Sequence, residues 1–247
     1  MKFTIEILPF VDSTQTHLES LLTTKNLEEG TLILATDQWQ GHGQEGNSWE
    51  SEAGKNLTFS LLLKPIGIKA ADQFYLNMAM SLGVTDYLME KKNISSPVFI
   101  KWPNDFYIGR KKVGGMIMNN AVSGDSLLHC IIGIGLNINQ FDFTKHCPNP
   151  TSLTLETRIE YDLNTELNTL LKSLTDRYQA LLDHGLMSIR KDYLARLFQI
   201  GIEAAYRIKG VLVYGMIQGV DEFGRLQFTQ NNNTSHCCDI REIEFVL

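Results

Sequence analysis

The segment VFIKWPNDFYIGRKKVGGMIM, residues 98–118, decides the kind of fold to expect. Apolar and aromatic runs at 98–102, 106–108 and 113–118 are typical of strands. Between the last two runs, residues 109–111 begin with glycine and predict a hairpin turn. The middle third of the chain is therefore expected to be β-sheet.

Segments on both sides add strands and helices to this sheet. Residues 31–36, 57–63 and 127–138 are further strand-like runs. Only Thr58 and Ser60 interrupt the apolar character of 57–63, as expected of a strand covered on both faces. Apolar side chains at helical spacing predict helices that begin at or near Ser13 and that span 71–92, 164–184 and 189–197. The sequence therefore predicts an α+β fold.

The end of the chain follows a different pattern. After residue 201, short strand-like runs alternate with glycines, and residues 221–224 predict a hairpin turn. We expect a first domain at residues 1–198 and a second at 199–247, the latter a small all-β barrel or sandwich. No linker rich in proline or serine separates them, so we expect the two domains to pack closely.

Composition and charge exclude several classes of protein. The formal net charge of -6 argues against nucleic acid as a main partner, because such partners are bound by clustered Lys and Arg. Residues 1–12 lack the features of a signal peptide, and no apolar run approaches the ~18 residues of a membrane span. We therefore expect a cytoplasmic protein without a membrane partner.

The cysteines give no sign of a metal or redox site. Cys130, Cys147, Cys237 and Cys238 lack the two-residue spacing that zinc sites and redox motifs use. His236 lies beside the last pair, but adjacent residues rarely point at one tetrahedral centre. No metal ligand is assigned.

The KWPND segment at 101–105 combines a cation, an aromatic ring, a proline turn, an amide and a carboxylate at the exit of a predicted strand. Open sheets often present functional groups at this place. The alternative, with equal weight, is a strand that proline terminates and whose Asn104 and Asp105 only cap the turn.

Lys112 follows Asp105 closely enough for a hairpin around Gly109 to fold the two together. Gly114 and Gly115 leave the backbone bare beside this lysine. A lone lysine in a basic turn is more often a solvated charge, but the glycine pair favours a site. We expect the carboxylate and the ammonium to share one pocket.

Two glycine-rich segments could approach a ligand with their backbone. GHGQEGN at 41–47 offers bare amides that suit an anion, although it lacks the Lys and Ser or Thr of a P-loop. A flexible surface loop explains it equally well. GIGLNIN at 133–139 ends an apolar strand, where glycine marks a close approach to a ligand or to another backbone.

Five segments in order resemble the motif series of biotin protein ligases, of the type without an N-terminal DNA-binding domain: 12–15, 41–49, 101–105, 112–115 and 133–137. The stretch REIEF at 241–245 resembles part of the small SH3-like domain of these ligases. The resemblance covers nearly the whole chain. It implies a catalytic domain similar to class II aminoacyl-tRNA synthetases, a mixed sheet with helices on one face, followed by a C-terminal SH3-like β-barrel.

The resemblance also implies an activity and its partners. Biotin carboxylate would attack the α-phosphate of ATP to give biotinyl-adenylate, and a lysine of a biotin carboxyl carrier domain would then take the biotinyl group. Mg²⁺ would hold the triphosphate, and no permanently bound cofactor is implied. Relatives often dimerise through the sheet, so a homodimer is one implied state.

The resemblance assigns roles to residues of the first step. The residues that would bind or surround biotin are Ser13, Thr14, Gln38, Gly41, His42, Gln44, Gly115 and Gly133. Lys112 would contact the carboxylate and the phosphate, and Asp105 would be the base for the carrier lysine.

The nucleotide would lie against a second group of residues. Gly43 would approach it with its backbone, Trp49 would offer a ring face to adenine, and Asn137 would form hydrogen bonds. Lys101 and Asn104 would support the pocket.

The glycine-rich loop departs from the family pattern, which has arginine after the first glycine. This chain has His42 there, Gln44 two positions later, and then Glu45, an anion where phosphates would bind. A protonated His42 would compensate in part, so adenylation is expected to strengthen below neutral pH; a flat rate from about pH 6 to 8 would contradict this. Two alternatives stay open: a protein that binds biotin or biotinyl-adenylate with impaired catalysis, and a lipoate-type acyl-adenylate ligase.

Overall fold

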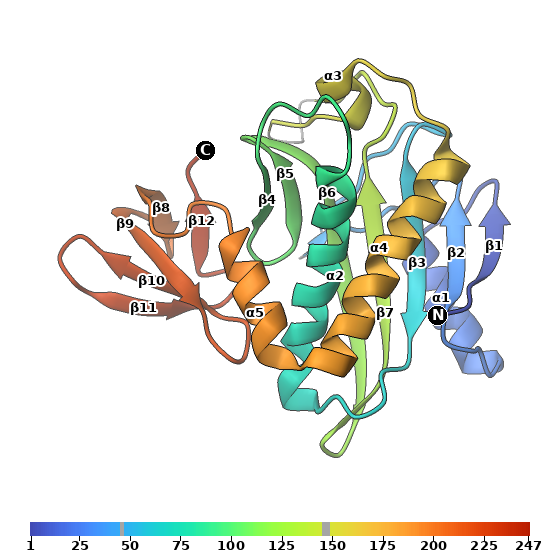
Figure 1. The fold of residues 1–247 in the computed structure, drawn as a ribbon, viewed down its shortest axis with the longest axis horizontal. Coiled ribbons are helices and arrows are strands. Elements are labelled where there is room, and N and C mark those ends of the chain that lie inside the picture. The colour runs from blue at the N-terminus through green and yellow to red at the C-terminus, as the bar shows by residue number, and fades with distance from the viewer. Residues whose placement is uncertain (45–46, 145–148) are drawn as a thin grey trace.

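A seven-stranded mixed sheet forms the centre of the computed structural model, which describes residues 1–44, 47–144 and 149–247 (Figure 1). Its strands are β1 (Thr4–Leu8), β2 (Thr31–Ala35), β3 (Leu57–Leu63), β4 (Val98–Lys101), β5 (Asp105–Ile108), β6 (Lys111–Ser123) and β7 (Ser126–Leu136). They lie in the order β1-β2-β3-β7-β6-β5-β4. Only the pair β1–β2 is parallel. The α+β prediction is confirmed, and β1 is a strand that the sequence analysis did not identify.

Helices cover one face of this sheet most fully. They are η2 (Ala70–Asp72), α2 (Gln73–Met89), α4 (Leu163–His184) and α5 (Leu186–Ala195), and a short helix, α3 (Leu153–Thr157), lies at one end. Figure 1 shows α2, α4 and α5 side by side in front of the strands. The predicted helices at 71–92, 164–184 and 189–197 correspond to three of them.

The expectation of helices on one face only is wrong, because α1 (Thr14–Thr24) packs on the opposite face. Its Leu18 joins Ile33, Leu62 and Ile131 in a small buried cluster. Successive strand residues point to opposite faces, so the neighbours of these three residues belong to the larger core on the other side. The central strands β2, β3 and β7 are therefore apolar on both faces.

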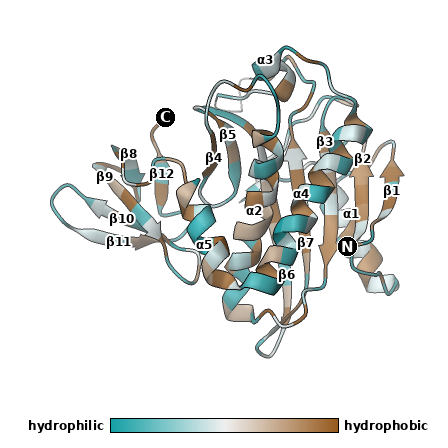
Figure 2. Ribbon diagram, in the orientation of Figure 1, coloured by the Kyte–Doolittle hydropathy of each residue, from teal (hydrophilic) through white to brown (hydrophobic). Residues whose placement is uncertain are grey.

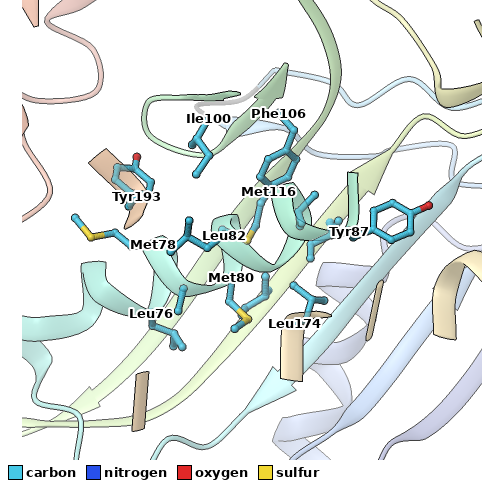
Figure 3. Close-up of a cluster of buried hydrophobic side chains, with 14 of the residues drawn as sticks. Leu76, Met78, Met80, Leu82, Tyr87, Ile100, Phe106, Met116, Leu174 and Tyr193 are labelled. Carbon is cyan, nitrogen blue, oxygen red and sulfur yellow. The ribbon is translucent and has the colours of Figure 1, made fainter. Parts of the chain in front are cut away.

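The larger core lies between the sheet and two long helices. Nearly every residue of α2 is buried, because the sheet covers one side of this helix and α4 the other. Figure 3 shows Met80 of α2 near Leu174 of α4. A Cβ atom on Gly83 would lie 2.9 Å from the Cα of Leu174, so glycine lets the two helices pack closely. By contrast, α4 is amphipathic, with polar and apolar residues interspersed along it (Figure 2).

The C-terminal part is a five-stranded antiparallel sheet beside β4 and β5 (Figure 1). Its strands are β8 (Glu203–Ile208), β9 (Val211–Val220), β10 (Leu226–Gln230), β11 (Ser235–Cys238) and β12 (Ile243–Phe245), in the order β11-β10-β9-β8-β12. The predicted all-β character is confirmed. Within residues 199–247, all of them described, no pairing of β11 with β12 closes this sheet into a barrel.

The two parts pack closely, as predicted, and share a continuous apolar core. The Trp102 indole N–H donates to the carbonyl oxygen of Gly224 at 2.9 Å, in the turn between β9 and β10. We propose that the two domains divide between residues 198 and 199, in the segment that connects α5 to β8. Among the described helices, none is long and apolar enough to cross a membrane.

Candidate functional site

A cleft of about 380 Å³ lies on the face of the sheet that α1 covers only in part. The strand register places Thr58, Gly135, Gly115, Asp105 and Lys101 in one row across β3, β7, β6, β5 and β4. Small or absent side chains at the first three positions leave space above the backbone. The row leads to a carboxylate and an ammonium, so the sheet itself positions the charged groups of the cleft.

One end of the cleft is a network of uncharged polar groups. The backbone N–H of Thr14 donates to Gln38 Oε1 at 2.8 Å, and the hydroxyls of Thr14 and Ser60 lie 2.8 Å apart. Ser60 also donates to Gln15 Oε1 at 3.1 Å, and Gln15 Nε2 donates to the carbonyl oxygen of Ile131. The structure thus brings the predicted residues Thr14 and Gln38 together.

Gln15 and Ser60 line the cleft together with Ser13, and neither was predicted as a site residue. Ser60 is fully buried, and its only signal was a polar residue within an apolar strand. Beside it, Gly133 has no side chain; a Cβ atom there would lie 2.8 Å from Gln15 Oε1 and 2.9 Å from Ile117 Cγ1. This end of the cleft has donors and acceptors around a space that Gly133 keeps open.

The predicted ion pair lies beside Gly115 in the cleft. Lys112 Nζ lies 2.7 Å from Asp105 Oδ1, and each side chain is about one quarter exposed. A register shift between Phe106 and Tyr107 accompanies this contact in the β5–β6 hairpin. The hairpin therefore joins the two charged groups as the sequence predicts, and both remain open to a ligand.

Lys101 and Asn104 lie next to this pair. The pKa of Lys101 is lowered, mainly because burial disfavours its charged form. Asn104 is buried and accepts a hydrogen bond from Gln44 Nε2 at 2.6 Å, which ties the glycine-rich loop to the turn after β4. This contact with Gln44 is consistent with the supporting role predicted for Asn104.

The glycine-rich loop closes on itself at one side of the cleft. The backbone N–H of Trp49 donates to the carbonyl oxygen of Gly41 at 2.8 Å. His42 and Ser48 pair in an isolated antiparallel β-bridge. His42, Gly43 and Gln44 line the cleft, whereas Gly41 does not. A Cβ atom on Gly41 would lie 2.7 Å from the Trp49 carbonyl oxygen, so Gly41 lets the loop close. Glu45 and Cys147 fall outside the described residues.

The aromatic side of the cleft is the indole ring of Trp49 against Gly135. A Cβ atom on Gly135 would lie only 2.3 Å from Trp49 Cε2, so the ring rests on bare backbone. The Trp49 indole N–H is buried and has no hydrogen-bond partner within the described residues. A ring face and an unpartnered donor suit a flat, polar ligand such as a nucleobase.

Asn137 lies behind the lining of the cleft. Its Nδ2 donates to the carbonyl oxygen of Thr151 at 2.9 Å, and its buried Oδ1 has no partner among the described residues. Direct hydrogen bonds from Asn137 to a nucleotide therefore stay a prediction.

The C-terminal sheet supplies a further wall that the sequence analysis did not assign. Ile240, Ile243, Glu244 and Phe245 all line the cleft. Across residues 1–44, 47–144 and 149–247, no group of three or more His, Cys, Asp or Glu is arranged to hold a metal ion. The cleft can accept a ligand with a hydrogen-bonding head, an anionic centre and an aromatic group.

Known proteins resemble this chain in sequence and in fold. Residues 7–137 match the Biotin/lipoate A/B protein ligase family. A biotin--[acetyl-CoA-carboxylase] ligase of Paracoccus denitrificans is 30% identical over 217 residues, which cover 85% of this chain and 89% of that protein. The bifunctional ligase/repressor BirA of Bacillus subtilis is also 30% identical, over 85% of this chain, but the match spans only 65% of the relative's length.

A solved structure matches the fold along the whole chain. The biotin protein ligase of Aquifex aeolicus in complex with biotin and ATP has a TM-score of 0.80 and 25% sequence identity, with 100% of each chain covered. The family match at residues 7–137 spans the cleft lining from Ser13 to Gly135, but not the wall that the C-terminal sheet contributes. This chain belongs to the Biotin/lipoate A/B protein ligase family.

Proposed function

We propose that this protein activates biotin with ATP as biotinyl-adenylate and transfers the biotinyl group to a lysine of a biotin carboxyl carrier domain. One observation carries the proposal: a polar network beside Gly133, the Trp49 ring on Gly135 and the Lys112–Asp105 pair beside Gly115 line one cleft. These three groups suit the three parts of biotinyl-adenylate, which are a ureido head, an acyl phosphate and an adenine.

In the first step, a biotin carboxylate oxygen attacks the α-phosphorus of ATP. The new oxygen–phosphorus bond replaces the bond to the β-phosphate, and pyrophosphate leaves. Two anions must approach each other, so cations fixed in the cleft lower the barrier. Lys112 would provide this charge at the reacting carboxylate, and backbone amides of Gly43 and its neighbours would add donors.

In the second step, the amine of the carrier lysine attacks the carboxyl carbon of biotinyl-adenylate. The carbon–nitrogen bond forms, the carbon–oxygen bond to phosphate breaks, and AMP leaves. The amine must lose a proton, which the Asp105 carboxylate would accept. The ion pair with Lys112 would keep this carboxylate in place at the cleft.

The remaining partners of the reaction are part of the same proposal. Mg²⁺ prefers phosphate and water oxygens and would enter with the triphosphate, so no protein ligand is assigned to it. The carrier domain would present its lysine at the open side of the Lys112–Asp105 pair. Dimerisation through the sheet stays a prediction, which analytical ultracentrifugation would measure.

Incubation with biotin, MgATP and a biotin carboxyl carrier domain tests the proposal. We expect avidin to detect label on the carrier, dependent on both biotin and ATP. Lipoate in place of biotin is expected to give no pyrophosphate release. Efficient use of lipoate would instead identify an acyl-adenylate ligase of the other branch of the family.

His42 motivates one second candidate, a protein that binds biotin or its adenylate without efficient catalysis. It lines the cleft at the loop position where the family pattern has a permanent cation. Biotin binding by calorimetry, with neither pyrophosphate release nor carrier labelling, would support this candidate over the ligase.

A further inference from the structure

Lys101 is a second cation of the cleft, which the carboxylate of Asp105, opposite it in the β4–β5 pair, attracts without a direct salt bridge. Among the described residues, no carboxylate forms a salt bridge with its ammonium, whereas Lys112 is paired with Asp105. Two aromatic faces surround the ammonium instead: Nζ lies 4.8 Å from the ring centroid of Phe245 and 5.8 Å from that of Tyr107. Ring faces attract a cation without neutralising it, so Lys101 keeps its charge for an anion.

Phe245 belongs to the C-terminal sheet and is fixed there by other rings. Its strand β12 pairs with β8, which places Phe245 opposite Tyr206. The ring centroids of these two residues are 5.3 Å apart, and Phe198 lies 6.3 Å from Phe245. Phe198 in turn stacks on Tyr107 at 5.6 Å. An aromatic cluster therefore connects the C-terminal sheet to both rings that hold Lys101.

We propose that Phe245 is a positioning residue, which holds the Lys101 ammonium in the cleft so that Lys101 binds a phosphate of the nucleotide. The inference rests on the proposed function for the identity of the anion. Biotin supplies one negative charge and the triphosphate several, and Lys112 already carries the role at the biotin carboxylate. The second cation of the cleft is therefore assigned to the nucleotide, and the C-terminal sheet contributes to nucleotide affinity through one ring.

The geometry favours this role over simple packing. Phe245 is only half-buried and lines the cleft, whereas Tyr206 and Phe228 fill the core of the C-terminal sheet. Burial also makes the charged form of Lys101 less favourable, which lowers its pKa. A ring face beside the ammonium offsets part of that effect and limits where it can lie.

The test measures nucleotide binding without turnover. The probe is α,β-methylene ATP with Mg²⁺, titrated by calorimetry into the full chain saturated with biotin. We expect Phe245→Leu to weaken binding about 3- to 10-fold, because leucine keeps apolar bulk but has no ring face. Phe245→Tyr should restore wild-type affinity. Lys101→Met should weaken binding about 10- to 100-fold, the range of a lost hydrogen bond to a charged group.

Coupling between the two residues separates positioning from packing. In a Lys101→Met background, Phe245→Leu should change the nucleotide affinity by less than about 2-fold, since the cation it positions is gone. Biotin affinity should stay unchanged in every variant. Phe223→Leu is the matched control, because Phe223 is an exposed aromatic of the same sheet near Arg225 and outside the cleft.

Several outcomes would overturn the inference. They are a wild-type affinity in Phe245→Leu, additive effects of the two substitutions, or equal losses of biotin and nucleotide binding. Loss of the cooperative thermal transition in Phe245→Leu, with Phe245→Tyr also weak in binding, would assign Phe245 to packing alone. If the binding results hold but no biotinyl-adenylate forms from biotin and ATP, the proposed function fails and this inference stands.

Discussion

Replacing Gly135 with alanine is expected to displace the Trp49 ring and weaken nucleotide binding. The added Cβ atom would lie 2.3, 2.5 and 2.8 Å from three ring atoms of Trp49, against an optimal carbon–carbon separation of about 3.5–4.0 Å. The ring must therefore move by more than about 1 Å, because the backbone of β7 is fixed between β3 and β6.

The size of the effect follows from the role of the ring. Stacking of a base on an aromatic side chain is worth about 1–3 kcal/mol, so its loss corresponds to about a 5- to 150-fold weaker affinity for the nucleotide. Calorimetry with α,β-methylene ATP and, separately, with biotin measures both affinities. We expect the biotin affinity of Gly135→Ala to change by less than about 2-fold, since the polar network lies beside Gly133 and not against the Trp49 ring.

Gly133→Ala is the matched control, two residues earlier on the same face of β7. Its Cβ atom would lie 2.8 Å from Gln15 Oε1 and 2.9 Å from Ile117 Cγ1. Gly133→Ala should therefore lower the affinity for biotin and leave the affinity for the nucleotide unchanged. Equal effects of the two alanines on both ligands would refute this division of the cleft. An unchanged nucleotide affinity in a folded Gly135→Ala protein would refute the stacking role of Trp49.

Three further predictions concern the base, the polar network and the helix layer. Asp105→Asn should reduce carrier labelling by about 10²- to 10⁴-fold while pyrophosphate release persists, because an amide cannot accept the proton; gel assays with avidin and a phosphate assay measure the two steps. Ser60→Ala should lower the free energy of unfolding in urea by about 1–3 kcal/mol and weaken biotin, because buried polar partners lose a hydrogen bond. In the helix layer, burial alone would raise the pKa of Asp86, but the hydrogen bonds and charges of Arg177 and Arg196 outweigh it and lower that pKa below 3.8. Asp86→Asn should therefore cost about 1–3 kcal/mol at pH 7, measured by urea unfolding.

The sign of the pH dependence follows from the lowered pKa of Asp86. The carboxylate stabilises the fold fully above its unfolded value of 3.8, and that stability is lost as the pH falls through the folded pKa. The difference in the free energy of unfolding between wild type and Asp86→Asn should therefore shrink as the pH falls below about 4. A constant difference would assign the effect to another cause. Equal loss of labelling and pyrophosphate release in Asp105→Asn, or an unchanged stability of Ser60→Ala, would contradict the other two predictions.

The central strands and long helices could be predicted because burial leaves a direct pattern in the sequence. The strand β3 is buried at every position, and its continuous apolar run identified it. The strand β1 could not be found in this way: four of its five residues are exposed, and it lies at the sheet edge. The sequence also did not indicate on which face of the sheet α1 packs, because both faces of the central strands are apolar.

The candidate site divides along the same line. Asp105 and Lys112 could be paired from the sequence, because one short hairpin connects them. Gln15, Ser60 and Phe245 could not, because their approach depends on strand register and on the docking of the C-terminal sheet. Contacts between residues far apart in the chain produce no recognisable spacing pattern in the sequence.

Formation of biotinyl-adenylate by Lys112→Met and Lys111→Met tests the central claim most directly. Lys112 lies in the cleft beside Asp105, whereas its neighbour Lys111 pairs with Glu156 outside the cleft. With biotin and MgATP, the account predicts that wild type and Lys111→Met release pyrophosphate at similar rates and that Lys112→Met loses about 100-fold or more. Equal rates in the two variants, or no adenylate from the wild-type protein, would contradict it.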